Sequence, residues 1–350
     1  MKTQAFIALA AGLAISVSAE AQQRDQIRIV GSSTVYPFST AVAESFGAKT
    51  GFATPVVEST GSGGGLRLFC SGVGTEHPDI TNASRRMLTS EYELCQSNGV
   101  REITEVRIGY DGIVLAAADN GQAAMDLTLT QLWLALADQV PADETCSSFV
   151  DNPHSAWSDV DASLPGQRIE VFGPPPTSGT RDAFVELALQ AGARGLACMA
   201  ELEESDPIRF DAIASRIRED GQWVDAGEND NAIVQTLVNT PTAFGVFGYS
   251  FLDQNSDRLI GTLIDGVEPE FYAIAEGDYP VSRSLFFYVK NQHAPIVPGI
   301  AEFVSEFTSE DAWGEFGYLS DRGLIPLLED ERDEVARSSR ALEPMTQAPE

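Results

Sequence analysis

Four residues near the middle of the chain, Ser178-Gly179-Thr180-Arg181, combine two hydroxyls, a glycine and a guanidinium. They follow a strand-like run, Arg168 to Phe172, and a Gly/Pro turn, and an apolar pattern at helical spacing comes next. The first N–H groups of a helix have no intrahelical partner and carry the positive end of the helix dipole. Such a combination suits a tetrahedral oxyanion. An ordinary N-cap explains the same residues when they are taken alone.

Two earlier stretches show the same order of strand, small polar turn and helix. Ile27 to Val30 predicts a strand, which is followed by Gly31-Ser32-Ser33-Thr34 and a helical pattern. A second strand, Thr54 to Glu58, precedes the glycine-rich turn of residues 59–65. Glycines there let a backbone approach a ligand and let N–H groups converge, although a flexible turn is the simpler explanation. The turn is neither a P-loop nor a nucleophile elbow, because it lacks the Lys of the former and the first Gly of the latter.

The alternation of strands and helices predicts α/β lobes with mainly parallel sheets. Ligands bind such folds beyond the carboxyl ends of the strands, so the turns at 31–34, 59–65 and 173–181 are interpreted as one site. A further strand ends in Ser84-Arg85-Arg86, a polar turn with two adjacent basic residues. The β-like run Val106 to Ala118 predicts a crossing between two lobes, and Phe244 to Tyr249 predicts the strand that returns.

These patterns divide the chain into five segments. Residues 1–21 are a signal peptide, 25–110 and 250–330 form a discontinuous first lobe, 111–249 form the second lobe, and 331–350 are a charged tail. The tail has no apolar periodicity, so we expect disorder beyond a possible helical turn. The first 21 residues have the basic, apolar and small-residue regions of a secretory signal, with cleavage after Ala19 or Ala21. A buried N-terminal helix is the weaker alternative.

Four cysteines follow the signal segment, which suggests two disulfides in an exported protein. We expect Cys70 to pair with Cys95 and Cys146 with Cys198, because each pair then stays within one lobe. Metal ligation is the competing interpretation. It is weak because no Cys-x-x-Cys occurs and the three His are scattered.

The formal net charge of −30 argues against nucleic acid or an anionic membrane as a partner. It does not exclude a small anion, since charges beyond a Debye length of ~8 Å are largely screened and local dipoles or a buried Arg can decide affinity. No run after the signal segment approaches the ~20 apolar residues of a membrane span.

Taken together, the motifs resemble those of the phosphate-binding component of bacterial phosphate ABC transporters, in the type II periplasmic binding protein superfamily. The resemblance covers about residues 27 to 327. It is carried by the following four segments: Gly31 to Pro37, Gly61 to Gly65, Asn82 to Arg85, and Ser178 to Arg181. It implies two α/β lobes joined by two crossing strands, with phosphate between them. It further implies a periplasmic, monomeric, non-enzymatic binding protein without a cofactor that delivers phosphate to a membrane permease.

The resemblance also implies a set of phosphate-binding residues. The first lobe supplies Ser33, Thr34, Val35, Ser62 and Arg85, and the second supplies Ser178, Gly179, Thr180 and Arg181. The chain departs from the best-known members twice. Arg85 stands where they have an Asp, and Pro174 stands where they have an Arg. We expect Arg181 to replace that missing cation and Arg85 to donate to phosphate oxygens.

Two other functions remain open from the sequence. One is a binding protein for another oxyanion, such as sulfate, molybdate or arsenate, because an Arg at position 85 cannot accept a hydrogen bond from a protonated ligand. The other is a phosphate-ester hydrolase, which lacks an evident metal cluster or a Ser paired with a His base. For the binding function we expect lobe closure through strands near Tyr110–Gly112 and Gly248–Tyr249.

Overall fold

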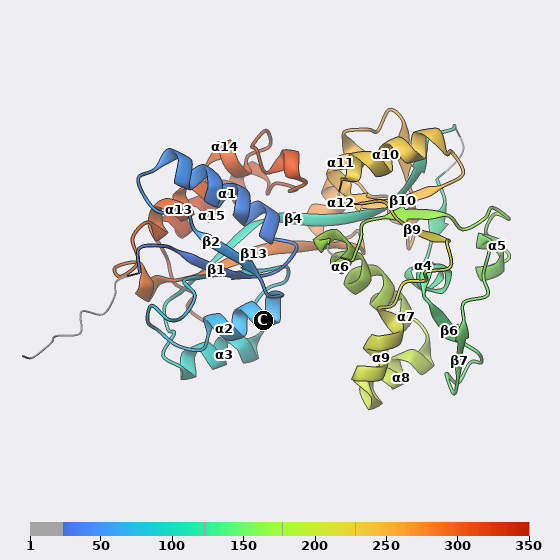
Figure 1. Ribbon diagram of the computed structural model, residues 1–350, viewed down its shortest axis with the longest axis horizontal. Helices are drawn as coiled ribbons and strands as arrows, with labels where there is room; N and C mark the ends of the chain where they lie inside the picture. The colour runs from blue at the N-terminus through green and yellow to red at the C-terminus, as the bar shows by residue number, and fades with distance from the viewer. Residues whose placement is uncertain (1–23, 122–123, 177, 228, 350) are drawn as a thin grey trace, which may run out of the picture.

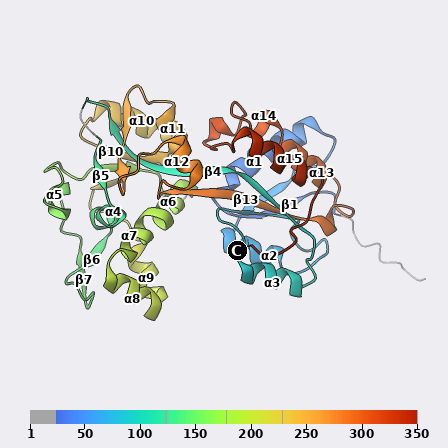
Figure 2. The ribbon, with the colours of Figure 1, turned by 180° about the vertical axis from the view of Figure 1, so that it is seen from behind.

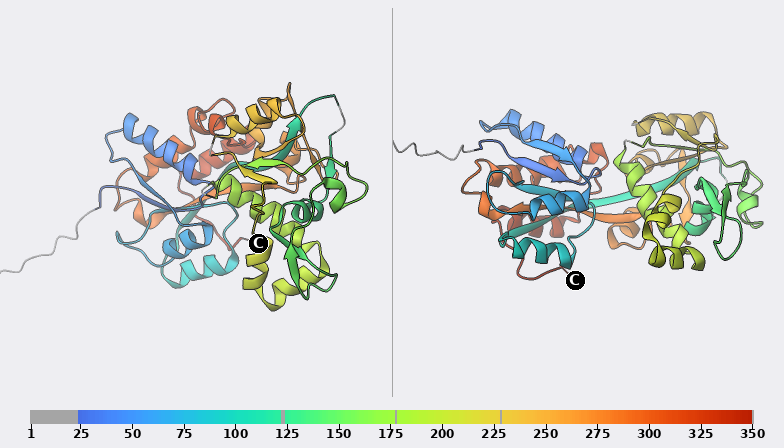
Figure 3. Two further views of the ribbon diagram at one scale, coloured as in Figure 1. Left: turned by 45° about the vertical axis from the view of Figure 1, so that its right-hand side comes forward. Right: turned by 60° about the horizontal axis from the view of Figure 1, so that its bottom comes forward.

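The computed structural model describes residues 24–121, 124–176, 178–227 and 229–349, so the predicted signal peptide lies outside the described residues. Two groups of helices and strands lie side by side and are joined by two long strands (Figure 1). These strands are β4 (Ile103–Ala118) and β13 (Ser282–Lys290). They run together from one lobe to the other in every view (Figure 3). The long run at 106–118 is therefore one continuous strand, as its β-like pattern predicts.

The first lobe is built on three parallel strands, β1 (Arg28–Gly31), β2 (Val56–Ser59) and β3 (Ile80–Ala83). The sheet continues in the order β2-β1-β3-β13-β4, and β13 is antiparallel to both of its neighbours. The helices of this lobe are α1 (Tyr36–Lys49), α2 (Ser62–Phe69), α3 (Thr89–Ser97), α13 (Ile300–Phe307), α14 (Glu310–Trp313) and α15 (Glu329–Arg340), with the 3-10 turns η2 (Asn291–His293) and η3 (Ser320–Arg322).

The second lobe extends the same sheet through β10 (Phe244–Gly248), β8 (Val171–Gly173) and β9 (Trp223–Asp225), which are parallel to one another. The remaining strands are β5 (Asp126–Leu127), β6 (Gln139–Pro141), β7 (Phe149–Asp151), β11 (Leu259–Gly261) and β12 (Leu263–Ile264). The helices are α4 (Leu129–Leu136), α5 (Trp157–Val160), α6 (Gly179–Phe184), the π-helix η1 (Val185–Gln190), α7 (Ala191–Arg194), α8 (Ala197–Ser205), α9 (Pro207–Ala214), α10 (Asp230–Asn239), α11 (Tyr249–Asp253) and α12 (Phe271–Glu276).

The return crossing is not where the sequence predicts it. Residues 244–248 form β10, which pairs with the far half of β4, from Ile113 to Ala117, and stays in the second lobe. The chain returns on β13 instead, which pairs with β4 from Gly112 back to Ile103. The sequence prediction was wrong because a buried apolar strand of five residues has the same pattern in a lobe as in a crossing. The two strands that link the lobes are thus β4 and β13.

The charged tail is also different from the expectation of disorder, because residues 329–340 form the helix α15. The helix contacts α13 and β4, and Figure 2 shows it beside both. Its anchor is Arg332, which is buried and forms two hydrogen bonds to the Glu310 carboxylate, at 2.8 and 3.0 Å. Charged side chains make these contacts, so an apolar-periodicity criterion cannot detect them. After α15, the Met345 N–H donates to the Ile103 carbonyl at the start of β4.

The structure joins Cys70 to Cys95 and Cys146 to Cys198, the local pairing expected from the sequence. The first disulfide ties the end of α2 to α3, and the second connects the β6–β7 loop to α8. Among the described helices, none is both long enough and apolar enough to cross a membrane.

Candidate functional site

The turns that follow β1, β2 and β3 meet at the carboxyl ends of these parallel strands in the first lobe. Gly31 closes β1, and β3 and α2 lie very close to it: a Cβ on Gly31 would lie 2.1 Å from the Asn82 carbonyl oxygen. A Cβ on Gly65 would lie 2.4 Å from the Gly31 Cα. No side chain fits at either position, so glycine is required here for packing. This close packing places the start of α2 beside the turn that follows β1.

The turns surround a cavity of ≈280 Å³. Its walls combine first-lobe turns with side chains from α6, η1 and β13, namely Ser32, Ser33, Thr34, Gly61, Ser62, Gly63, Ser84, Arg85, Asp182, Glu186 and Arg283. Four of the predicted residues, Ser33, Thr34, Ser62 and Arg85, therefore line one cavity. We call it the turn pocket. The pocket lies between the lobes, because α6 and η1 belong to the second lobe.

Arg283 is a cation of this pocket that the sequence does not reveal, and the carboxylates of Asp182 and Glu186 were not expected there either. The Arg283 side chain is only 8% exposed, and one guanidinium nitrogen donates to the Thr34 hydroxyl at 2.9 Å. Another lies 2.6 Å from the Glu186 carboxylate, and Nε lies 3.5 Å from Asp111 Oδ2. Burial raises the pKa of the Asp111 carboxyl, and the nearby Arg283 guanidinium opposes this rise. The only signal in the sequence was a cation at the start of a strong strand, and the sequence does not show that this strand crosses the cleft.

The two lobes touch directly at this pocket. The Ser33 hydroxyl donates to Asp182 at 2.7 Å. The second-lobe turn packs on the first-lobe turn at Gly179, where a Cβ would lie 2.9 Å from the Ser33 carbonyl oxygen and from the Thr34 backbone. Glycine at 179 therefore allows the two backbones to approach each other. This contact confirms that the turns at 31–34 and 173–181 come together.

Arg85 reaches the turn pocket with its guanidinium already engaged. Two of its nitrogens donate to the Glu91 carboxylate at 2.9 and 2.8 Å. The hydrogen bonds to Glu91 raise the pKa of Arg85. Burial opposes ionisation of Glu91, but the bonds from Arg85 and the Leu88 N–H outweigh it and lower the pKa of Glu91. Arg85 therefore stays charged and is held by α3 at the wall of the pocket.

Two other first-lobe residues are occupied by local hydrogen bonds. The Ser62 hydroxyl accepts from the Ser84 N–H at 3.0 Å and lies 3.1 Å from the Ser84 hydroxyl. Val35 is fully buried in the core, and its N–H donates to the Ser32 hydroxyl at 3.4 Å. Ser62 still lines the turn pocket, whereas the side chain of Val35 serves the core.

The second-lobe motif is arranged differently. Ser178 is the N-cap of α6, and its hydroxyl accepts from the Thr180 N–H at 3.2 Å. Arg181 turns away from the turn pocket: it donates to Asp225 at 2.7 Å and to the Pro174 carbonyl at 3.1 Å, and it lies 4.9 Å over the Trp223 ring. The structure therefore does not bring Arg181 to the turn pocket, where the sequence interpretation placed it. The position of Asp225 at the end of β9 explains the difference.

A Ser–His pair does occur in the first lobe, although no obvious pair was expected from the sequence. The Ser71 hydroxyl lies 2.8 Å from His77 Nδ1, and His77 Nε2 lies 3.5 Å from Glu76. Ser71 follows the carboxyl end of α2, whereas the turn pocket is at its amino end. The pair is therefore separate from the turn pocket. Among the described residues, no group of three or more His, Cys, Asp and Glu could hold a metal ion.

Comparison with known proteins gives relatives along most of the chain. Protein SphX of Synechocystis is 30% identical over 328 residues, which cover 91% of this chain and 83% of the relative. The phosphate-binding protein PstS of Staphylococcus haemolyticus is 26% identical over 80% of this chain and 75% of its own length.

Solved structures show the same fold. A possible phosphate binding protein from Planctomyces limnophilus has a TM-score of 0.70 and 27% identity, and the match covers 91% of this chain and 98% of that one. An ABC-type phosphate transport receptor from Vibrio cholerae has a TM-score of 0.53 and 18% identity, with coverage of 82% and 95%. The fold is the two-lobed type II fold expected from the sequence. The PBP superfamily domain matches residues 16–311, and the chain belongs to that superfamily.

Proposed function

We propose that this protein captures inorganic phosphate in the turn pocket and delivers it to the permease of an ABC transporter. The observation that carries the proposal is the convergence of Arg85, Arg283, Thr34 and the start of α2 on one cavity between two lobes. Guanidinium groups, hydroxyls and helix N-termini are the donors that tetrahedral oxyanions require. Membership of the PBP superfamily and the names of the PstS relatives support a solute-binding role.

In this proposal Arg283 is the principal cation. It is buried, it is held from one side by Asp111, and it already donates to Thr34. A guanidinium that is fixed before the ligand arrives loses little side-chain entropy on binding. Ser33, Ser62 and Arg85 complete the first-lobe half of the site. On the second-lobe side, Ser178 caps α6 and Gly179 packs on the first-lobe turn, and Thr180 lies between Gly179 and Arg181, so these residues shape the wall of the site.

The carboxylates of Asp182 and Glu186 also line the turn pocket. An entering anion would displace Asp182 from Ser33 and Glu186 from Arg283, because each donor can serve the ligand in place of the carboxylate. A carboxylate that stays near the anion is tolerated only where the ligand carries a proton for it to accept. Both groups therefore favour a protonated phosphate over a fully deprotonated anion of the same shape.

Release would follow from movement of the two lobes about β4 and β13. The Ser33–Asp182 and Thr34–Gly179 contacts span the lobes, so an anion that replaces them couples its binding to the position of the second lobe. We infer an exported, periplasmic location and a monomer that presents its closed form to the permease. A non-enzymatic role is the one that the binding-protein relatives favour.

Calorimetric titration of the exported chain with phosphate, sulfate, arsenate and molybdate at fixed ionic strength tests the proposal. We expect phosphate to bind and Arg283→Met to weaken it strongly. The matched control is Arg194→Met, which removes a guanidinium paired with Glu203 on the second lobe. Absence of phosphate binding, or equal losses in the two variants, would contradict the proposal. Tighter binding of another anion would instead assign the pocket to that oxyanion.

A further inference from the structure

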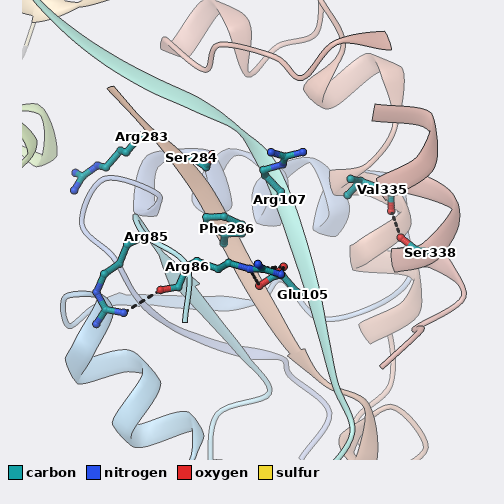
Figure 4. A pocket seen from close by; sticks show the side chains of 9 residues that line it. All are labelled: Arg85, Arg86, Glu105, Arg107, Arg283, Ser284, Phe286, Val335 and Ser338. Carbon is teal, nitrogen blue, oxygen red and sulfur yellow. Dashed lines mark hydrogen bonds and ion pairs between the residues drawn. The ribbon is translucent and has the colours of Figure 1, made fainter. Parts of the chain in front are cut away.

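A second, larger cavity opens beside the turn pocket. Its volume is ≈580 Å³, and Figure 4 shows that its side chains come from β4, β13, the turn after β3 and the helix α15. Four arginines line it, namely Arg85, Arg86, Arg107 and Arg283. This is a marked concentration in a chain that has 22 basic residues and a net charge of −30. We call it the arginine cavity.

Each arginine of the arginine cavity is paired with a carboxylate. Glu105 is the carboxylate within the lining, where it holds Arg86 at 2.8 Å. Among the partners of the other three, Glu91, Glu331 and Glu186 lie outside the lining. The lining therefore contains four arginines and one carboxylate, with the hydroxyl residues Ser284 and Ser338 on its walls. An anion that enters can accept from guanidinium groups in exchange for carboxylate partners that lie outside the lining.

The two cavities share part of their walls. Arg85 and Arg283 line both, and in Figure 4 both side chains extend toward the same side of the view, away from α15. Arg107 lies further along the paired strands β4 and β13. It pairs with Phe286, which is three residues from Arg283 on β13. Three residues of strand correspond to roughly 10 Å. The row of cations is therefore longer than one phosphoryl group.

We propose that the site takes a two-phosphoryl anion such as pyrophosphate, with one group in the turn pocket and the second in the arginine cavity near Arg107. This inference rests on the proposed function. An organic substituent fits the lining less well, because its apolar side chains are Val335 and the largely buried Phe286, which offers no open aromatic face. A longer chain of phosphates gains little, since the next cavity adds no basic side chain beyond Arg86 among the described residues.

Calorimetry with orthophosphate and pyrophosphate on the exported chain tests this inference. In Arg107→Gln, pyrophosphate affinity is expected to fall by roughly tenfold, the effect of losing one charge-assisted contact, while orthophosphate affinity stays within about twofold. Arg194→Gln is the matched control and should change neither value. Glycerol 3-phosphate serves as a probe with one phosphoryl group and an organic substituent.

A structural role for Arg107 must be separated from a binding role, because Arg107 pairs with Glu331 of α15. Glu331→Gln breaks that ion pair but keeps an oxygen for the Tyr110 hydroxyl, which donates to Glu331 at 2.9 Å. If Arg107 binds the second phosphoryl group, Glu331→Gln frees its guanidinium and pyrophosphate affinity holds or rises. If the Arg107–Glu331 pair only anchors α15, Arg107→Gln and Glu331→Gln both lower pyrophosphate affinity.

The outcomes separate the two proposals. Failure of the wild-type protein to bind orthophosphate would overturn the proposed function itself. Orthophosphate binding without pyrophosphate binding would overturn only the present inference. Equal weakening of both anions by Arg107→Gln would do the same, as would parallel losses in Arg107→Gln and Glu331→Gln. Binding of glycerol 3-phosphate as tight as that of pyrophosphate would also overturn it, because the cavity would then not select a second phosphoryl group.

Discussion

The turn after β1 and the turn before α6 share one sequence pattern, a strand followed by small hydroxyl residues and a helix, yet the structure uses them differently. In the first, Thr34 accepts from the buried Arg283 and faces the turn pocket. In the second, the Ser178 hydroxyl caps its own helix. The same local pattern therefore lines the turn pocket in one lobe and caps a helix in the other. The difference depends on which distant elements pack against each turn.

The arginines associated with the two turns differ in the same way. Arg283 comes from a crossing strand and reaches the cleft, where carboxylates hold it on two sides. Arg181 follows its turn directly in sequence but bonds to Asp225 and lies over Trp223. Proximity in sequence is thus a poor guide to which cation reaches the turn pocket. The position of neighbouring carboxylates decides it.

The largest expected effect contrasts these two arginines. Arg283→Met should lower phosphate affinity by about a hundredfold or more, because a hydrogen bond to a charged group contributes about 1.5–3 kcal/mol and truncation leaves Asp111 buried without its partner. Arg181→Met should stay within about threefold, since its guanidinium is directed elsewhere. Calorimetric titration of both variants with phosphate measures the difference.

A loss of folding in Arg283→Met must be separated from a loss of binding. The double variant Arg283→Met with Asp111→Asn removes the uncompensated carboxylate and should recover the thermal midpoint without recovering affinity. The contrast between the two lobes would be reversed if Arg181→Met caused the greater loss of affinity.

Lys290, at the opposite end of β13 from Arg283, is a buried cation that does not serve the site. Its Nζ donates to the Gly72 carbonyl at 2.6 Å and lies 4.9 Å over the Phe69 ring, and burial lowers the pKa of Lys290 to about 8. The unfolded chain then binds more protons than the folded chain above pH 8, so rising pH stabilises the fold. Between pH 8 and 9.5 the free energy of unfolding should rise by roughly 2 kcal/mol relative to Lys290→Met, since one pKa unit corresponds to about 1.4 kcal/mol.

Urea unfolding of the wild type and Lys290→Met at pH 7, 8 and 9.5 measures this effect, and the other titrating groups cancel in the difference. Phosphate affinity should be the same in both proteins. A difference in stability that does not change with pH would show that Lys290 keeps an ordinary pKa in the fold.

The contact between the two turns gives a third prediction. Gly179→Ala should weaken phosphate binding by about tenfold, because its Cβ would meet backbone atoms of Ser33 and Thr34 at 2.9 Å and such overpacking costs about 1–3 kcal/mol. Gly51→Ala, in the first lobe but outside the turn pocket, should change affinity little, since its Cβ would approach nothing within 4 Å. Titrations of the two variants compare one alanine substitution in each lobe.

Scattering profiles with and without phosphate complement those titrations. If Gly179 only shapes its own turn, Gly179→Ala should leave the closed form unchanged. If it sets the approach of the lobes, the variant should remain more open at saturating phosphate.

Much of the first lobe could be predicted because its signals are local. The strands before residues 31, 59 and 84 and their polar turns follow from patterns within short stretches, and the Cys70–Cys95 disulfide joins residues 25 positions apart. Arg283 could not be predicted, because 249 residues separate it from Thr34. Helix α15 was missed for a different reason: ion pairs such as Arg332–Glu310 hold it, and charge alone does not reveal a docking partner. The crossing strand was misassigned because burial in a lobe and burial in a crossing give the same apolar pattern.

The smallest expected effect concerns Ser178 itself. Because its hydroxyl accepts from the Thr180 N–H, Ser178→Ala should lower the free energy of unfolding by about 1 kcal/mol, the usual cost of removing an N-cap. If capping is its main role, phosphate affinity should change by less than about threefold, and Ser178→Asp should restore stability. Chemical denaturation and titration of the same two variants separate capping from ligand contact. A loss of affinity in Ser178→Ala at unchanged stability would make the two turns equivalent halves of the site and remove the contrast between them.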